Sequence, residues 1–428
     1  MMSRIKLPLI LIIIAVFLTQ ACGKKEKLSE TDFSEIYGID SDDPSPRFVV
    51  YHSNDEETEV HFMVHNRTLT YGLSPTGLEE AQIKVKWELY KGFESKEVID
   101  SSTFEMIDTI AFKGSNQLSG DFKINATYPN SYLLKVVLID MIKKEEIVSF
   151  VEIDKRNKNN RQNFKVTLKS TGALLFREYL YPGEEVLIEY KKDRHSGPLY
   201  NHHFSMIFPI APPPFALNQK VKFNYDNHTL SELINQGSGV FSFTPGDNGF
   251  YHITPSNETK NGWTVYAFGE DYPEINTPEE MLSAMRFVLT KKEYNALKNT
   301  PELRKNLERF WLKAGQNPDR ARELIKLYYS RVENANYYFT SYKEGWKTDR
   351  GIIYIVFGPP DVVYRSGNGE TWIYGEEKNY RSTNFNFNKV INPFTNNDYE
   401  LVRSTIYKNP WYRSVDAWRQ GRISSKDA

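Results

Sequence analysis

The stretch Glu344-Gly-Trp-Lys-Thr-Asp-Arg-Gly-Ile-Ile-Tyr-Ile-Val-Phe-Gly-Pro-Pro-Asp361 is the densest in structural signals. Residues 352–357 are all apolar, which predicts a strand that is covered on both faces. The Gly-Pro-Pro-Asp sequence at 358–361 then breaks this strand with a turn. Beyond it, the runs 362–364 and 371–374 flank a Ser-Gly-Asn-Gly turn, and this spacing predicts a hairpin.

Upstream of this stretch, the chain carries repeated signals for the start of a helix. Each is a side chain that caps backbone N–H groups, followed by a proline or by a glutamate three residues later. They stand at Thr277-Pro278, Thr290, Thr300-Pro301 and Asn317-Pro318. After the last, apolar residues recur at helical spacing and predict a helix that runs to about Phe339. Helices followed by hairpins predict an α+β domain over residues 276–410, with a C-terminal tail at 411–428.

The part of the chain before these helices is predicted to be mainly β. Alternating apolar and polar residues at 59–65, 83–90, 132–140 and 146–153 predict a β-sandwich over residues 47–158. Similar runs predict a second Ig-like β-sandwich over residues 159–275. A proline-rich loop, Phe208-Pro-Ile-Ala-Pro-Pro-Pro-Phe215, interrupts the second one because proline cannot donate to a ladder. Its two phenylalanines either dock on a partner or pack on their own domain, and we favour the packing.

The N-terminus has the pattern of an export signal. Residues 1–21 combine a basic start, an apolar stretch of roughly 12 residues and a small residue before Cys22. The apolar stretch is shorter than the roughly 20 residues of a spanning helix. The segment resembles a bacterial lipoprotein signal with Leu18-Thr-Gln-Ala-Cys22 as its lipobox, so Cys22, the single cysteine, is the expected lipidation site. Residues 22–46 are polar and are predicted to form a flexible tether.

The Gly-Trp-Lys-Thr-Asp-Arg-Gly sequence at 345–351 resembles the signature of the GWxTD domain family of bacterial envelope lipoproteins. Flanking residues agree with the family pattern from about Met285 to Ile406, including Phe310-Trp311 upstream and Gly358-Pro-Pro-Asp361 downstream. The resemblance brings no catalytic roles with it. The motif residues that it singles out are Gly345, Trp346, Thr348, Asp349, Arg350, Gly351, Gly358, Pro359, Pro360 and Asp361.

Two interpretations of this motif stay open. In the structural one, Gly345 and Gly351 take positive φ on either side of a bend, and Trp346 fills the space between helix and sheet. Thr348 and Asp349 then accept hydrogen bonds from backbone donors in the bend. In the functional one, the side chains of Asp349, Arg350 and Glu370 form a polar cluster at the mouth of a cleft. We favour the structural interpretation.

Residues for common catalytic chemistry are scarce in the C-terminal part. No histidine follows His252 and no cysteine follows Cys22, so this region lacks the usual proton shuttle and soft metal ligands. His195, His202 and His203 cluster near the proline loop, and we interpret them as surface or packed residues rather than ligands. We therefore predict no catalytic residue, no metal and no cofactor. Nucleic acid is not an expected partner because basic residues alternate with acidic ones.

Charge is unevenly distributed along the chain. Residues 286–428 carry 25 basic and 16 acidic side chains, although the whole chain has a formal charge of −1. The first expectation for function is a non-catalytic interaction or scaffold module in the cell envelope. It would be anchored to the outer membrane by lipid, face the periplasm and contact a partner protein or glycan. The alternatives are a carboxylate-dependent hydrolase of envelope glycan or peptide, and a carrier or chaperone for exported chains with an exposed apolar groove.

Overall fold

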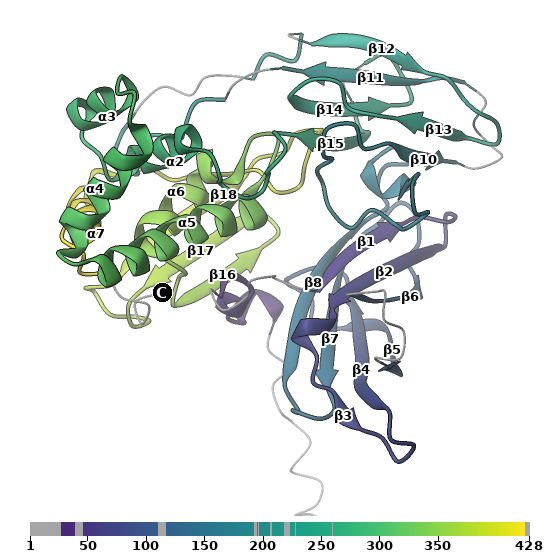
Figure 1. Ribbon diagram of the computed structural model, residues 1–428. Coiled ribbons are helices and arrows are strands. Elements are labelled where there is room, and N and C mark those ends of the chain that lie inside the picture. Colours follow the sequence, from purple (N-terminus) through teal and green to yellow (C-terminus); the bar gives the residue numbers. More distant parts are fainter. Residues whose placement is uncertain are drawn as a thin grey trace, which may run out of the picture.

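The computed structural model describes residues 27–38, 46–109, 117–191, 195, 197–205, 208–217, 223–226, 228–258 and 260–423. The predicted signal sequence and Cys22 lie outside these ranges. The described chain has a mainly β N-terminal region of two sandwiches, and helices and a further sheet follow in the C-terminal part (Figure 1). The predicted fold class is confirmed. Within the described ranges, no helix has the length and apolarity needed to cross a bilayer.

The first sandwich consists of two antiparallel sheets that enclose one core. One sheet has the order β1-β2-β6, and in the other β4 lies between β7 and β5, with β8 beside β7 and the short β3 beside β4. The strands are β1 (Arg47–Tyr51), β2 (Glu57–His65), β3 (Gly72–Leu73), β4 (Glu79–Tyr90), β5 (Val98–Thr109), β6 (Gln117–Asn125), β7 (Ser131–Asp140) and β8 (Glu146–Asp154). Val60, Phe62 and Val64 alternate into the core as the period-two pattern predicts. Trp87 of β4 stacks on Phe122 of β6 across the sandwich.

The second sandwich packs a sheet of order β13-β10-β9 against one of order β12-β11-β14-β15. Its strands are β9 (Phe164–Leu168), β10 (Val186–Tyr190), β11 (Leu199–Phe204), β12 (Thr229–Leu233), β13 (Val240–Phe243), β14 (Gly249–Thr254) and β15 (Trp263–Ala267). Every residue of β14 and β15 is buried. One face of these strands packs in the sandwich core, and the other meets Phe394 of the C-terminal part in an aromatic cluster.

Up to residue 423, where the described range ends, the C-terminal part packs six helices with the sheet β16-β17-β18-β19. The helices are α2 (Pro278–Ala284), α3 (Lys291–Lys298), α4 (Leu303–Gly315), α5 (Pro318–Phe339), α6 (Asp349–Phe357) and α7 (Lys408–Arg419). The strands are β16 (Val362–Ser366), β17 (Gly369–Tyr374), β18 (Thr383–Lys389) and β19 (Tyr399–Leu401). Thr277 and Thr290 form the predicted capping boxes, and Asn317 caps α5, which ends at Phe339. The predicted start at Thr300 is wrong, because α4 begins after Glu302 without a side-chain cap.

The apolar run at 352–357 is a helix, and the prediction of a strand is wrong. Thr348 caps α6, whose residues Ile352 to Val356 are all fully buried. A helix that is covered on every side has no polar face, so its sequence lacks the 3.6-residue periodicity that would distinguish it from a buried strand. The hairpin predicted after the Gly-Pro-Pro-Asp turn is confirmed as β16 and β17.

Two segments that were expected to lie outside the folded parts pack into the core instead. Leu28, Phe33 and Tyr37, within the predicted tether, are at least nine-tenths buried. Phe33 N donates to Val363 O at 2.8 Å, so this segment covers the free edge of β16. At the other end, Trp411 and Trp418 of α7 are buried in the same core, so the predicted tail begins inside a helix. In the N-terminal segment, isolated apolar residues gave no periodic signal, whereas Trp411, Val415 and Trp418 recur at a helical spacing that the prediction of a tail overlooked.

The proline loop packs on the protein itself. Phe208 is mostly buried against Phe250 of its own sandwich and Tyr342 of the C-terminal part. Phe215 contacts Tyr412 of α7. Ala211 N donates to Lys347 O at 2.9 Å, which ties the loop to the GWxTD-like motif. The loop therefore joins the second sandwich to the C-terminal part rather than folding back on its own domain alone.

Candidate functional site

The GWxTD-like motif forms the connection between α5 and α6. A short 3₁₀ turn at Gly345–Lys347 leads into α6, and Thr348 stands between them. The Thr348 hydroxyl donates to Gly345 O at 2.7 Å and accepts from Gly351 N at 3.0 Å. Trp346 N donates to the amide oxygen of Asn336 on α5 at 3.2 Å. These bonds satisfy the backbone of a buried bend, which is the requirement for burying it at all.

The two glycines of the motif allow close backbone contact. Neither Gly345 nor Gly351 has the positive φ that the sequence interpretation assigned to it. An ideal Cβ on Gly345 would lie 1.9 Å from Ala335 O, and one on Gly351 would lie 2.0 Å from Gly345 O. The motif therefore needs glycine because α5, the 3₁₀ turn and α6 touch through their main chains.

Trp346 fills space beside this connection. Its side chain is 6% exposed and belongs to the core cluster that unites α5, α6 and the strands β16–β18. The Lys347 ammonium lies 5.3 Å from the centre of the indole ring. Truncation of this ring would open a large cavity in the centre of the C-terminal part.

Asp349 holds the chain segment that follows β19. Its carboxylate accepts from Leu401 N at 2.9 Å and from Arg403 Nη1 at 3.1 Å. Arg403 Nη2 also donates to Pro212 O at 3.2 Å, so the ion pair reaches the proline loop. Asp349 is 7% exposed and stands in the first turn of α6, where a negative charge favours the helix. The Asp349 carboxylate therefore connects α6 to the end of β19 and, through Arg403, to the proline loop.

Arg350 and Glu370 form a buried ion pair in the same core. Arg350 Nη1 donates to Glu370 Oε1 at 3.2 Å, and both side chains are almost fully buried. Arg350 Nη2 donates to Asn397 O at 2.9 Å. The guanidinium carbon lies 3.9 Å from the centre of the Tyr399 ring, a cation–π contact that adds to the pair.

Three further side chains, besides Arg350, donate hydrogen bonds to the Glu370 carboxylate. Arg365 Nε donates to Oε1 at 2.9 Å, and Trp372 Nε1 donates to Oε2 at 3.0 Å. The hydroxyl of Tyr37 donates to both carboxylate oxygens at 3.1 Å. Burial disfavours the ionised carboxylate, but Arg365 and Arg350 outweigh it and lower the pKa of Glu370 to about 2. Burial beside this carboxylate raises the pKa of the Tyr37 phenol.

The structure thus brings Arg350 and Glu370 together and directs Asp349 to Arg403 instead. All three are less than a tenth exposed. The sequence interpretation missed their partners Tyr37, Arg365, Trp372 and Arg403. Tyr37 stands 333 positions before Glu370, and no local pattern could have linked them. Arg365 lies opposite Glu370 in the β16–β17 hairpin, so its pairing follows from the hairpin register.

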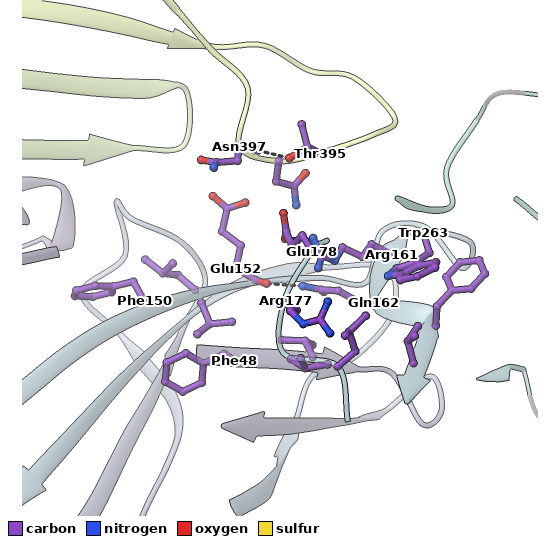
Figure 2. Close-up of a pocket in the computed structure, with 18 of the residues that line it drawn as sticks. Phe48, Phe150, Glu152, Arg161, Gln162, Arg177, Glu178, Trp263, Thr395 and Asn397 are labelled. Atoms are coloured by element: carbon purple, nitrogen blue, oxygen red, sulfur yellow. Dashed lines mark hydrogen bonds and ion pairs between the residues drawn. The ribbon is translucent and has the colours of Figure 1, made fainter. Parts of the chain in front are cut away.

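A cavity of about 290 Å³ lies where the three parts of the protein meet (Figure 2). The first sandwich contributes Phe48 and Phe150, the second contributes Trp263, and the C-terminal part contributes the loop around Asn397. Gln162 Nε2 donates to Glu152 O at 2.7 Å across it. Asp349, Arg350 and Glu370 do not line this cavity.

The charged residues of this cavity already have partners. Arg161 pairs with Glu178, and Lys389 binds the Glu152 carboxylate at 2.7 Å. The described lining holds neither histidine nor cysteine. These ion pairs neutralise the charges where the three parts of the protein meet.

Two histidines of the second sandwich, His202 and His252, are buried in its interior, whereas His195, His203 and His228 are half-buried. His202 contacts the His228 ring at 2.9 Å and Thr254 Oγ1 at 3.0 Å, while His203 stacks on Tyr251. Burial lowers the pKa of both His202 and His252 to about 4. His195 Nε2 lies 3.3 Å from Pro198 O. Among the described residues, no group of three or more His, Cys, Asp or Glu side chains is placed to hold a metal ion.

A protein-family model described as the GWxTD domain matches residues 249–420. The C-terminal part of this chain is a GWxTD domain. The match begins at β14, inside the second sandwich, and ends in α7, so it is wider than the span from Met285 to Ile406 on which the resemblance rested. The aromatic cluster of Phe250, Tyr266 and Phe394 gives a physical reason, because it makes β14 and β15 part of the packing of the GWxTD domain.

No curated protein matches the chain. Among solved structures, the chain is similar to the crystal structure of red sea bream transglutaminase, with 10% identity and a TM-score of 0.19. The similarity covers 52% of this chain and 31% of the transglutaminase, so the chain spans about a third of that protein's length. A likeness at this TM-score carries no argument about fold or function.

Proposed function

We propose that this protein is a lipid-anchored component of the bacterial cell envelope and that it acts as a non-catalytic interaction or scaffold module. The observation that carries the proposal is that the carboxylates of Asp349 and Glu370 are bound inside the fold. Asp349 is bound by Leu401 N and Arg403, while Glu370 is bound by two guanidinium groups, a phenol and an indole. A general acid would need a raised pKa and access to a substrate, and the pKa of Glu370 is lowered instead.

The anchor in this proposal is Cys22, acylated after removal of residues 1–21. The docked segment at 27–38 begins five positions after this cysteine. A chain of that length spans at most about 18 Å, because an extended residue covers roughly 3.6 Å. The first sandwich and the GWxTD domain, which both contact this segment, would then stay close to the outer membrane and face the periplasm. A partner protein or a glycan of the envelope would meet the protein there.

The test of the anchor compares the wild-type protein with Cys22→Ser in a bacterium that processes lipoproteins. We expect the wild-type mature chain to begin at Cys22, to carry diacylglycerol and fatty acid by mass spectrometry, and to fractionate with membranes. We expect Cys22→Ser to lack lipid and to keep its leader. A wild-type chain with a free thiol and an uncut leader would overturn the anchor.

The non-catalytic part of the proposal needs a separate measurement. The full-length protein is incubated with purified peptidoglycan and with envelope protein extracts. Binding without release of reducing ends or new amino termini is the expected result. Turnover that depends on the amount of protein would instead establish the hydrolase alternative.

A further inference from the structure

One end of the first sandwich exposes a group of large aliphatic side chains. The turns that join β3 to β4 and β7 to β8 meet here, and Met141 N donates to Gln82 O at 2.9 Å. Ile107 is 61% exposed and Ile142 is 43% exposed. We call this group the sandwich tip, and it consists of Leu78, Ile107, Met141 and Ile142. A group of exposed aliphatic side chains on a folded domain marks a contact site.

The sandwich tip has an acidic rim. Its carboxylates follow the aliphatic residues directly in sequence or share their turns, and they are Glu79, Glu80, Asp108, Glu145 and Glu146. Two lysines, Lys143 and Lys144, stand among them. The excess of negative charge disfavours contact with an anionic lipid surface and favours a basic protein surface.

A matching concave surface lies on the GWxTD domain of the same chain. The groove has a volume of about 700 Å³ and runs between the proline loop, the start of α3 and one face of α7. We call it the helical groove. Its apolar lining includes Pro213, Phe215, Phe287, Leu289, Trp411, Tyr412 and Val415. Pockets of this size and composition accept several aliphatic side chains.

The helical groove has a basic rim. Arg286 and Arg419 line it, together with Asp416. The exposed residues Lys291 and Arg413 directly follow lining residues, and the exposed Lys292 follows Lys291. The guanidinium of Arg286 lies 5.3 Å from the centre of the Tyr294 ring, and that of Arg419 binds Glu293 at 2.8 Å. The helical groove thus has an apolar floor and a mainly basic rim, whereas the sandwich tip has an apolar surface and a mainly acidic rim. The two surfaces are therefore complementary in both apolarity and charge.

We propose that the sandwich tip of one molecule docks into the helical groove of a second copy of this chain. The tip and the groove of one molecule lie at opposite ends of it, since β3 and α3 are far apart in the fold (Figure 1). The contact is therefore made between two copies of the chain, and it joins the sandwich tip of one copy to the helical groove of the other. Such a head-to-tail contact leaves one tip and one groove unused at the ends of each assembly, so copies add to an open chain or a ring.

This proposal deepens the interaction role proposed above and rests on it for its setting. Copies that share a membrane are confined to a plane, and this raises their effective concentration for one another. The contact itself needs no acyl chain. Its failure and the failure of the anchor are consequently separate results.

The test uses full-length protein in mild detergent and measures its assembly by sedimentation velocity. The tip variant carries Ile107→Asp and Ile142→Asp, and the groove variant carries Tyr412→Glu and Lys291→Glu. All four side chains are exposed, so thermal unfolding should stay unchanged. The control is Ile234→Asp, which alters an 81% exposed aliphatic residue of the second sandwich.

We expect the wild type and the control to form assemblies that grow beyond a dimer as concentration rises. Each of the two variants alone should remain a monomer. An equimolar mixture of them should form a dimer and nothing larger, because the intact groove of one meets the intact tip of the other. A monomeric wild type, a tip variant that still assembles alone, or a mixture that stays monomeric would each overturn the proposal. Mass spectrometry of the same samples reports acylation at Cys22 independently.

Discussion

The substitution Glu370→Gln lowers the free energy of unfolding by about 3–5 kcal/mol, the range measured when one member of a buried ion pair is removed. Glutamine keeps the volume of the side chain but leaves Arg350 and Arg365 facing a neutral amide. The Arg350 guanidinium is almost fully buried and has no route to water that would compensate. The Tyr37 hydroxyl and the indole of Trp372 also lose a charged acceptor. Chemical denaturation of the full-length protein measures the difference.

Glu308→Gln is the matched control for this prediction. Glu308 stands on α4, where its side chain is exposed, and the same chemical change there should alter stability by less than about 0.5 kcal/mol. If the two variants unfold alike, Glu370 does not hold the core of the GWxTD domain. A second variant, Tyr37→Phe, removes the hydroxyl that donates to the Glu370 carboxylate and should cost about 1.5–3 kcal/mol.

The substitution Gly345→Ala should be as severe for a different reason. The added Cβ would lie 1.9 Å from Ala335 O and 2.8 Å from Asn336 Cα, and both are main-chain atoms of α5. No rotamer change can relieve a clash with backbone, so α5 must move away from the motif. Overpacking of a tight core costs about 1–3 kcal/mol, and we expect the upper end of that range or beyond.

Gly367→Ala provides the control, because nothing lies within 4 Å of its ideal Cβ and its φ is not positive. Both variants are compared in the same denaturation experiment. Equal stability would show that α5 and the motif do not touch through their backbones.

The long helix α5 and the strands of the sandwiches were predictable from the sequence because they have one buried and one exposed side. Asn317 with Pro318 marks the start of α5, and its apolar residues mark the inner face. In β2, the alternation of Val60, Phe62 and Val64 does the same at period two. Where a segment is buried on all sides, as α6 is, this contrast disappears and the type of element cannot be read.

The candidate site was only partly predictable. The motif pointed to Asp349, Arg350 and Glu370, but their environment depends on contacts between distant segments. Arg403 reaches Asp349 from the segment after β19, and Tyr37 reaches Glu370 from the N-terminal segment. The role of Gly345 was also misassigned. A close backbone contact and a positive φ both require glycine, so the sequence alone does not distinguish between them.

The carboxylate of Glu370 is a structural group that stays ionised at neutral pH. Its pKa falls from an ordinary 4.5 to about 2 in the folded protein. The folded state therefore binds its proton less readily than the unfolded state does. The resulting stability is complete at neutral pH and is lost as the pH falls from about 5 toward 2.

Carbon-13 NMR of the full-length protein labelled at glutamate side chains, with Glu370→Gln for assignment, follows this carboxyl directly. We expect the carbon-13 chemical shift of the Glu370 carboxyl to stay constant between about pH 4 and pH 8. It should change only near the lowest pH at which the protein remains folded. A midpoint near or above about pH 6 is the behaviour of a general acid, and it would contradict the claim that the motif holds the structure rather than performing chemistry.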